Sequence, residues 1–468
     1  MYRQTFVESS ELDRAVIATC ATHEPLGAYA AAHLLHYLFV DAQGVLDLAS
    51  PRPAPGRPSV SVAGEIPLFD WHEREMRDTR DVAFTGLPNE RALFIAGDGT
   101  IPPALTAEGK GVNIIVVGPV HAGIIEPGRF TFSSGGETVL HLDAQLSYSR
   151  RGVERFLQGL DAVGAAPRVA RVCAACSVAR SWAYARALES LAGVVCDERT
   201  EWTRLIFAEL ERLYNHIFDL SSSSAGAGYG HGQTQGLALK ERVHRICAEA
   251  TGHRFAFDAI VPGGVRTAES FDPHALATHI EQLRGHVDGY LDALFRNRSL
   301  VRRFEGAGHV SAETARAFGT VGPARRASGG TIDIRSCAPY GAYRAAPPQC
   351  FTETGGDVAA RCAVKRLEIG ESFKLIERAF AELDGHAPPA AGTLRAGSGT
   401  VTTVTEGARG AETVSITCDD TGQLARVHFI SASYRNWPTV LRAMEANIVP
   451  DFPLVNKSFN LCYACADR

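Results

Sequence analysis

The chain has 468 residues, and at about 100–200 residues per domain this length predicts two to four domains. Its 47 Lys and Arg residues are outweighed by 52 Asp and Glu residues, and the formal charge of −5 argues against a nucleic-acid-binding protein, which would show a basic face. Hydrophobic residues make up 45% and charged residues 21%, which excludes wholesale disorder, and eleven cysteines are too sparse for a disulfide scaffold.

The beginning of the chain, MYRQTFVESSELDR, is polar and carries both charge signs, so no Sec-type signal is visible. The longest weakly charged stretch, residues 25–40, contains two histidines and is shorter than the ~20 apolar residues that span a bilayer. We therefore expect a cytoplasmic protein with reduced cysteines that could still reach a membrane through partners.

The first part of the chain, residues 1–105, is predicted to form a small α+β unit interrupted by a Pro-rich loop at residues 50–58. A charged stretch follows at residues 66–94, and residues 100–111 have the Gly, Pro and Ala content of a linker. Residues 112–117 are a β-branched run that predicts a strand, and residues 129–147 alternate around a Gly-Gly pair as a β-hairpin does.

From Arg151 onward the pattern becomes helical. Helices are expected at residues 169–193, 198–220, 274–295, 358–383 and 439–446, with a β-rich region at residues 393–430. The run SSSSAGAGYG at residues 221–230 is expected to end the second helix, either as a flexible connector or as a tightly packed segment.

The cysteines contain two C-x-x-C pairs, Cys173/Cys176 and Cys462/Cys465. Two such turns brought together supply four thiolates, the soft ligand set that suits Zn, Ni or Fe–S centres. The long separation between the pairs disfavours a local zinc ribbon and favours a buried site where the end of the chain returns to its middle. Unrelated buried thiols and a structural zinc site remain as alternatives.

The chain resembles the large, catalytic subunit of membrane-associated, energy-converting [NiFe] hydrogenases of the formate hydrogenlyase type, a group similar to the 49-kDa subunit of respiratory complex I. Ordered sequence blocks carry the resemblance: IPLFDWHEREMRD (66–78), GPVHAGIIEPGRF (118–130), YSRRGVE (148–154), RVCAACSVARSWAYARALE (171–189), VPGGVR (261–266), RASG (326–329), DIRSCAPYGAY (333–343), GGDVAARCAVKRLEIGES (355–372), EGARGAE (406–412) and SFNLCYACADR (458–468).

This resemblance implies an α+β fold with two domains. Residues 1–105 resemble the complex I 30-kDa subunit and would be a docking domain, and residues 106–468 would be a mainly helical large-subunit domain with peripheral β-sheets. Trp71, Glu73, Arg74 and Glu75 of the first block would then be interface or structural residues, against the alternative of a solvated charged helix.

The resemblance also implies a Ni–Fe centre with diatomic ligands on iron. Cys173 and Cys462 would be terminal nickel ligands, and Cys176 and Cys465 would bridge the two metals, with Cys465 also assisting catalysis. Thiolates suit this work because they are soft and can take a proton.

Two further residues match catalytic positions of the family. Glu154 would pass protons between the site and solvent, which calls for a semi-buried carboxyl with a raised pKa, and its alternative is a surface helix carboxylate. Arg409 would lie above the open metal position as a fixed cation, and its alternative is a buried ion pair.

Several positions depart from the family pattern. Ala174 and Arg180 stand where the first cysteine box usually has Gly and His, Arg150 replaces a common His, and residues 460–461 replace Asp-Pro. Arg180 would therefore contact the cofactor with a permanent charge in place of a neutral imidazole, which leaves either a metallated site with altered potential or a site losing its metal.

Three classes of function follow. The first is a [NiFe] hydrogenase large subunit that oxidises H2 or reduces protons and passes electrons to the [4Fe-4S] clusters of an iron–sulfur small subunit, on the inner face of the cell membrane beside antiporter-like membrane subunits, with nickel maturation factors as further partners. The second is a complex I-like NADH/quinone oxidoreductase coupling subunit, a branch that lacks the four cysteines, with His121 lining a quinone cavity unless it is a satisfied turn histidine. The third is an assembly protein with a four-cysteine zinc site.

Overall fold

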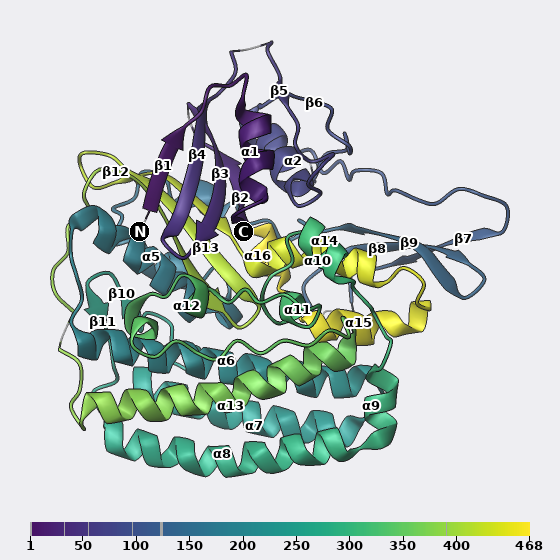
Figure 1. Cartoon of the computed structure of the whole chain (residues 1–468). Helices are drawn as coiled ribbons and strands as arrows, with labels where there is room; N and C mark the ends of the chain where they lie inside the picture. The colour runs from purple at the N-terminus through teal and green to yellow at the C-terminus, as the bar shows by residue number, and fades with distance from the viewer. Residues whose placement is uncertain (1, 32, 55, 96, 122–124, 390) are drawn as a thin grey trace.

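The computed structural model describes residues 2–31, 33–54, 56–95, 97–121, 125–389 and 391–468. It has the expected α+β architecture: an N-terminal sheet unit, a central three-stranded sheet and a layer of long helices (Figure 1). Among the described residues, no helix combines the length and the apolar character needed to cross a membrane.

The N-terminal sheet unit has four strands in the order β1-β4-β3-β2, with β1 parallel to β4 and the other neighbours antiparallel. Strand β3 divides its side chains between two cores: Leu38 belongs to the main core, whereas Tyr37 and Phe39 pack with helices α1 and α2. Both faces of the sheet are therefore covered, one of them by the rest of the chain. The elements are β1 Tyr2–Phe6, α1 Leu12–Cys20, β2 Glu24–Ala30, β3 Leu34–Asp41, β4 Gly44–Pro51, β5 Ser59–Val60, α2 Phe69–Arg80 and β6 Phe84–Thr85.

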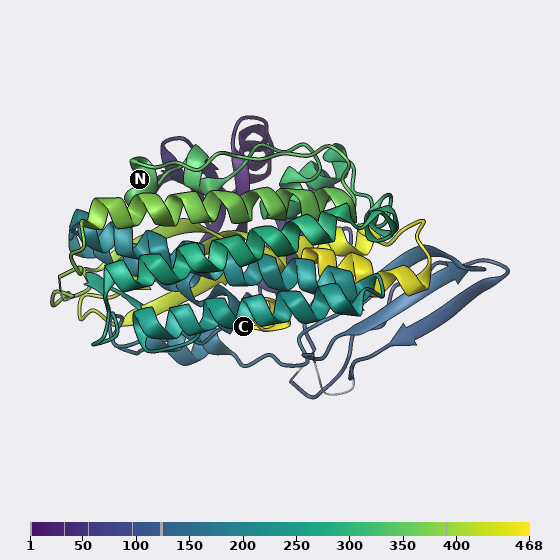
Figure 2. The same ribbon diagram turned by 90° about the horizontal axis from the view of Figure 1, so that it is seen from below.

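The predicted strand and hairpin at residues 112–147 are confirmed as an antiparallel sheet of β7 Val112–Val117, β8 Arg129–Gly135 and β9 Thr138–Gln145. The β8–β9 turn places Gly136 at φ +62°, a left-handed conformation that glycine adopts without strain. This sheet projects beyond the long helices in both views (Figures 1 and 2) and exposes Ile114 and Val116.

The long helices α6, α7, α8 and α13 lie side by side (Figure 2) and pack on one another. Aspartates begin three of them: the side chains of Asp197, Asp272 and Asp357 accept hydrogen bonds from backbone N–H groups of the first turn. The expected helices at residues 274–295 and 358–383 are confirmed. The bounds are α6 Glu198–Gly226, α7 Gly230–Thr251, α8 Pro273–Arg296 and α13 Val358–Leu383.

The Ser/Gly run at residues 221–230 corrects one expectation, because α6 continues through it to Gly226. Ser223 and Ser224 are buried, and their hydroxyls donate to the carbonyls of Asp219 and Leu220, four residues earlier. A Cβ on Gly236 of α7 would lie 2.6 Å from Cβ of Ser221, so the run is a tightly packed helix end and not a flexible connector.

The central sheet is antiparallel and lies between the N-terminal sheet unit and the long helices (Figure 1). Its strands are β12 Gly399–Gly407, β13 Gly410–Cys418 and β14 Leu424–Ile430. The helix expected at residues 439–446 is wrong in its bounds: α14 is Ala432–Ala443, and α15 Phe452–Phe459 and α16 Tyr463–Asp467 follow it.

Shorter elements connect these layers. The helix expected at residues 169–193 is broken before the first cysteine box and resumes after it as α5. These elements are α3 Val153–Leu157, α4 Ala166–Ala170, η1 Ala174–Cys176, α5 Ser177–Ala192, β10 Ile260–Val261, β11 Gly264–Val265, α9 Arg298–Phe304, α10 Ala312–Ala317, α11 Gly322–Arg326, α12 Ile334–Cys337, η2 Gly341–Arg344 and η3 Val449–Asp451.

Candidate metal centre

The two C-x-x-C pairs meet in space. Cys173 precedes the short turn η1, Cys176 ends it, Cys462 precedes α16, and Cys465 lies within α16. Their four Sγ atoms all lie within 4.8 Å of one another. Cys173, Cys176 and Cys465 are buried and Cys462 is half-buried. The arrangement could therefore hold a metal, as expected of a chain end that returns to the middle.

Local contacts explain how each box is held. The backbone N–H groups of Val178 and Ala179, at the start of α5, donate to the Glu211 carboxylate at 2.6 and 3.1 Å. On the other side, Cys462 N donates to Ser433 Oγ at 3.0 Å, and Ala464 N donates to Glu126 Oε2 at 2.7 Å. Side chains from distant segments thus satisfy the first N–H groups of both helices, which have no partner within the helix.

Two arginines reach the thiols. Arg180 Nη2 donates to Cys465 Sγ at 3.2 Å, and Arg409 Nη1 donates to Cys176 Sγ at 3.8 Å. Arg409 stands in the two-residue turn between β12 and β13, whose Gly407 and Gly410 are paired, and this short connection fixes its backbone. Both guanidinium groups are buried, so their positive charge acts on the sulfurs with little screening by water.

The environment favours thiolate. The pKa of Cys465 is well below its ordinary value, because the thiols of Cys173, Cys176 and Cys462 hydrogen-bond to it and Arg180 adds a positive charge. A thiolate is the form that binds a metal.

Two carboxyls beside the centre were missed by sequence reasoning. Glu412 accepts from Arg180 Nη2 at 2.8 Å, and burial raises its pKa to about 7. Burial also raises the pKa of Glu211 to about 8. Glu412 lies in the sequence block that contains Arg409, but only the fold places it against Arg180.

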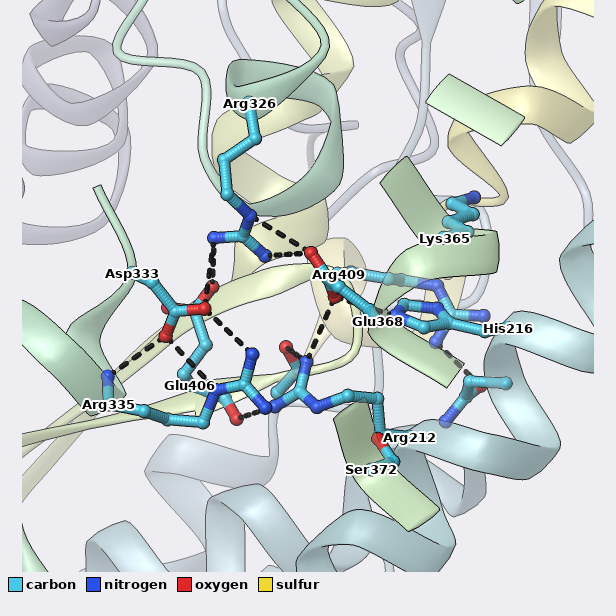
Figure 3. A network of polar contacts seen from close by, with 12 residues as sticks. Arg212, His216, Arg326, Asp333, Arg335, Lys365, Glu368, Ser372, Glu406 and Arg409 are labelled. Carbon is cyan, nitrogen blue, oxygen red and sulfur yellow. Dashed lines mark hydrogen bonds and ion pairs between the residues drawn. The ribbon is translucent and has the colours of Figure 1, made fainter. Parts of the chain in front are cut away.

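Arg409 also leads into a buried belt of charged side chains, most of which Figure 3 shows. Arg409 Nη1 donates to Asn215 Oδ1 at 3.0 Å, and its Nη2 lies 3.9 Å from Asp219, which pairs with Lys365 at 2.6 Å. The belt continues through further ion pairs on α6, α11, α12, α13 and β12, formed by Arg212, His216, Glu209, Arg326, Asp333, Arg335, Glu368 and Glu406.

Glu406 is the most readily protonated carboxyl of this belt. Its pKa is raised to about 7 by burial and by the neighbouring Asp333 carboxylate, against the opposing effect of Arg326. The pKa of Glu368 is lowered instead, because Arg326 and His216 outweigh the effect of burial.

Glu154 lies at the other side of the centre, in α3. Its carboxylate accepts from Phe429 N at 2.9 Å, lies 3.1 Å from Nδ1 of His428, and pairs with Arg468 at 3.2 Å. Burial alone would raise the pKa of Glu154, but His428, Arg468 and Arg426 outweigh it, and the pKa is lowered. The expected raised pKa is therefore wrong, and so is the alternative of a plain surface carboxylate.

Arg468 links Glu154 to the N-terminal sheet unit through a 2.6 Å ion pair with Glu75 of α2. The alternative of a solvated charged helix for Trp71, Glu73, Arg74 and Glu75 is wrong, because all but Trp71 are buried and Trp71 is half-buried. Glu73 accepts from Tyr37 Oη and Val62 N, and Tyr434 Oη donates to the Trp71 carbonyl.

His121 is described, whereas residues 122–124 of its sequence block lie outside the described residues. Its Nε2 lies 2.8 Å from the carbonyl oxygen of Gly128, and its ring is tilted against Phe130. These contacts favour the satisfied turn histidine over a histidine that lines a cavity.

Comparison with known proteins agrees with this architecture. Residues 232–396 and 386–468 match the family described as the 49 Kd subunit of respiratory-chain NADH dehydrogenase. Formate hydrogenlyase subunit 5 of Escherichia coli (strain K12) is 29% identical over 435 residues, covering 87% of this chain and 76% of that protein. An NADH-quinone oxidoreductase protein of Bacteroides thetaiotaomicron is 27% identical over 370 residues, covering 70% and 69%.

A solved structure shares the fold. A chain of the membrane-bound sulfane sulfur reductase (MBS), an archaeal respiratory membrane complex, superimposes with a TM-score of 0.70 at 22% identity, covering 77% of this chain and all of that one. The fold and the paired cysteine boxes thus define a member of the hydrogenase and complex I class of oxidoreductases. The chain belongs to the family of the respiratory-chain NADH dehydrogenase 49 Kd subunit.

Proposed function

We propose that this chain is the large catalytic subunit of a membrane-associated [NiFe] hydrogenase that oxidises H2 or reduces protons reversibly. The observation that carries the proposal is the convergence of four cysteine Sγ atoms within 4.8 Å of one another in a chain 29% identical to formate hydrogenlyase subunit 5. Electrons would pass to [4Fe-4S] clusters of a separate small subunit.

The residues fit a Ni–Fe centre with diatomic ligands. Four thiols suit soft metals, three of them are buried, and two buried arginines offset the negative charge that a thiolate-bound metal carries. Cys173 and Cys462 would be terminal ligands, and Cys176 and Cys465 would bridge. When bound, the centre supplies the heterolytic cleavage and re-formation of H2 and the exchange of electrons.

The side chains around the centre would divide the remaining work. Arg180 holds Cys465 as the thiolate and balances its charge, and Arg409 does the same for Cys176 while it faces the centre from the β12–β13 turn. Glu154 would accept a proton and release it to solvent; as an ionised carboxylate it is ready to accept one.

The family description and the NADH-quinone oxidoreductase relative favour a second candidate, a complex I-like coupling subunit of an NADH-quinone oxidoreductase. In that case His121 would line a quinone cavity and NAD would react in a partner protein. The four converging cysteines favour the hydrogenase over this alternative.

The same proposal includes the assembly. Residues 1–105 would be a docking domain like the complex I 30-kDa subunit, and residues 106–468 the large-subunit domain. The partners would be an iron–sulfur small subunit, antiporter-like membrane subunits and nickel maturation factors, on the cytoplasmic face of the membrane. A relative in a membrane complex supports this placement.

The test is metal analysis of the chain co-expressed with nickel maturation factors, together with H2-dependent dye reduction. We expect close to one Ni and one Fe per chain, lost in Cys465→Ala but retained in the matched control Cys247→Ala, a buried cysteine of α7 outside the cluster. Zinc at the site without H2-dependent dye reduction would overturn the proposal and favour the zinc-bearing assembly protein. A metal-free chain active in quinone reduction would favour the complex I-like alternative.

A further inference from the structure

A cavity of about 390 Å³ opens where the end of α2 faces α3, β14 and the C-terminal residue. Arginines from separate parts of the chain line it: Arg80, Arg150, Arg155, Arg426 and Arg468. We refer to it as the arginine cavity. Its position beside Glu154 does not by itself explain why so many guanidinium groups gather there.

The carboxylates that line the arginine cavity already have partners. Glu75 pairs with Arg468, and Glu154 is held by Arg468, His428 and Phe429 N. Asp78 pairs with Arg77 and accepts from Leu93 N, and Asp467 accepts from Ser147 N and Ser149 N. Little acceptor capacity therefore remains for the other arginines.

Those arginines have donors to spare. Within the part of the chain that the structure describes, the guanidinium groups of Arg80, Arg150 and Arg155 make no hydrogen bond or ion pair; Arg150 lies over the Phe94 ring at 3.9 Å. Arg426 lies no closer than 3.6 Å to Glu154. The Nε atoms of Arg80 and Arg426 are buried without a hydrogen-bond partner.

Unpaired buried donors cost free energy, and positive charges gathered around a cavity repel one another. Burial and the nearby Arg426 lower the pKa of Arg80, in agreement with this repulsion. An oxyanion relieves both costs, because guanidinium groups bind carboxylate and phosphate oxygens with paired, charge-assisted hydrogen bonds.

We propose that the arginine cavity binds a small dissolved oxyanion, carrying a carboxylate or a phosphate group, between the N-terminal sheet unit and the rest of the chain. Arg80 and Arg426 supply the buried donors, and Arg155 closes the solvent side. The site is separate from the cysteine cluster, so the inference stands whether or not the proposed function holds.

The test is a calorimetric titration of the purified full-length chain at low ionic strength with inorganic phosphate and, separately, with acetate; acetamide is the uncharged match of acetate. We expect saturable binding of phosphate or acetate at one site per chain, no binding of acetamide, and weakening as salt screens the charges. Preference for phosphate or for acetate identifies which oxyanion class the site takes.

Arg80→Gln and Arg155→Gln should each weaken the affinity about tenfold or more, because each removes a charge-assisted hydrogen bond. Arg245→Gln, at an exposed position on α7, is the matched control and should bind as the unmodified chain does. Since Arg155 is exposed, its variant should keep the unfolding temperature of the parent, which separates lost binding from lost folding. Absence of saturable binding, or equal binding by all variants, would overturn the proposal.

Discussion

Arg180 donates from one nitrogen, Nη2, both to Sγ of Cys465 at 3.2 Å and to Oε2 of Glu412 at 2.8 Å. The cation is thus held between a thiol of the cluster and a carboxylate of β13, and all three side chains are buried. This neighbour explains how the chain tolerates a permanent charge beside the cluster, because Glu412 compensates it.

Removing Arg180 should therefore be costly. Arg180→Met leaves Glu412 buried without its cation, and we expect the free energy of unfolding to fall by about 3–5 kcal/mol. The double variant Arg180→Met/Glu412→Gln should recover part of that loss, because no unpaired charge remains. Urea unfolding of both variants measures this, with the exposed Arg296→Met as control within about 0.5 kcal/mol of the parent. Equal losses in the single and double variants would contradict the pairing.

Glu154 should contribute stability that depends on pH. Its pKa is lowered on folding from the ordinary 4.5, so its contribution is present above pH 4.5 and is lost as the pH falls through the lower folded pKa. We expect Glu154→Gln to destabilise the chain by about 1–3 kcal/mol at pH 7 and by progressively less below pH 5. Urea midpoints of both proteins from pH 7 to pH 4 measure the difference, and a constant gap would count against the ion pairs with His428 and Arg468.

Glu73 should show the opposite sign. Burial raises its pKa from 4.5 to about 7, so the folded state binds a proton that the unfolded chain has released, and stability falls as the pH rises from 4.5 to 7. Glu73→Gln keeps the shape without the titration, and above pH 7 it should be more stable than the parent by up to about 3 kcal/mol. Thermal unfolding at pH 5 and pH 8 tests this; Glu65→Gln, at an exposed position of the same unit, should follow the parent at both pH values.

The packing of α6 against α7 makes a further prediction. A Cβ on Gly236 would meet Ser221 Cβ at 2.6 Å and Tyr290 Oη at 2.7 Å, so Gly236→Ala should destabilise by about 1–3 kcal/mol. Gly285→Ala on α8 meets nothing within 4 Å and should be neutral or stabilising by up to about 1 kcal/mol, because alanine favours a helix. Chemical denaturation of the pair tests the close contact; equal effects would show that α6 and α7 do not touch there.

The same region shows what could be predicted from the sequence. Helix α13 matches its predicted range because Asp357 and a long amphipathic pattern mark it locally. The end of α6 was missed because Ser and Gly signal a break in isolation, whereas in the bundle small side chains permit the contact with Gly236 and serine hydroxyls bond back to the helix. Tertiary packing overrides propensity in such places.

The candidate site divides in the same way. The four cysteines were found because their C-x-x-C spacing is a local signal. Glu211, Glu412 and the direction of the Glu154 pKa could not be found, because each depends on partners far away in the chain: Val178, Arg180 and His428. Spacing predicts ligands that share a turn, and only the fold shows which charges surround them.

The last prediction concerns the link between Glu75 and Arg468. Arg468 lies three residues after Cys465, and its guanidinium is held by Glu75 of α2 at 2.6 Å and by Glu154 at 3.2 Å. Glu75→Gln removes one of these two carboxylate partners, so we expect α16 to open more often and its amide hydrogens to exchange several-fold faster, with about 1–3 kcal/mol of local stability lost. Hydrogen exchange of residues 463–468 measures this whether or not metal is bound. Under the proposed function, nickel release to a chelator should accelerate in parallel. Glu65→Gln, at an exposed position in the same unit, is the control. Unchanged exchange in Glu75→Gln would show that the N-terminal sheet unit does not help to hold the second cysteine box.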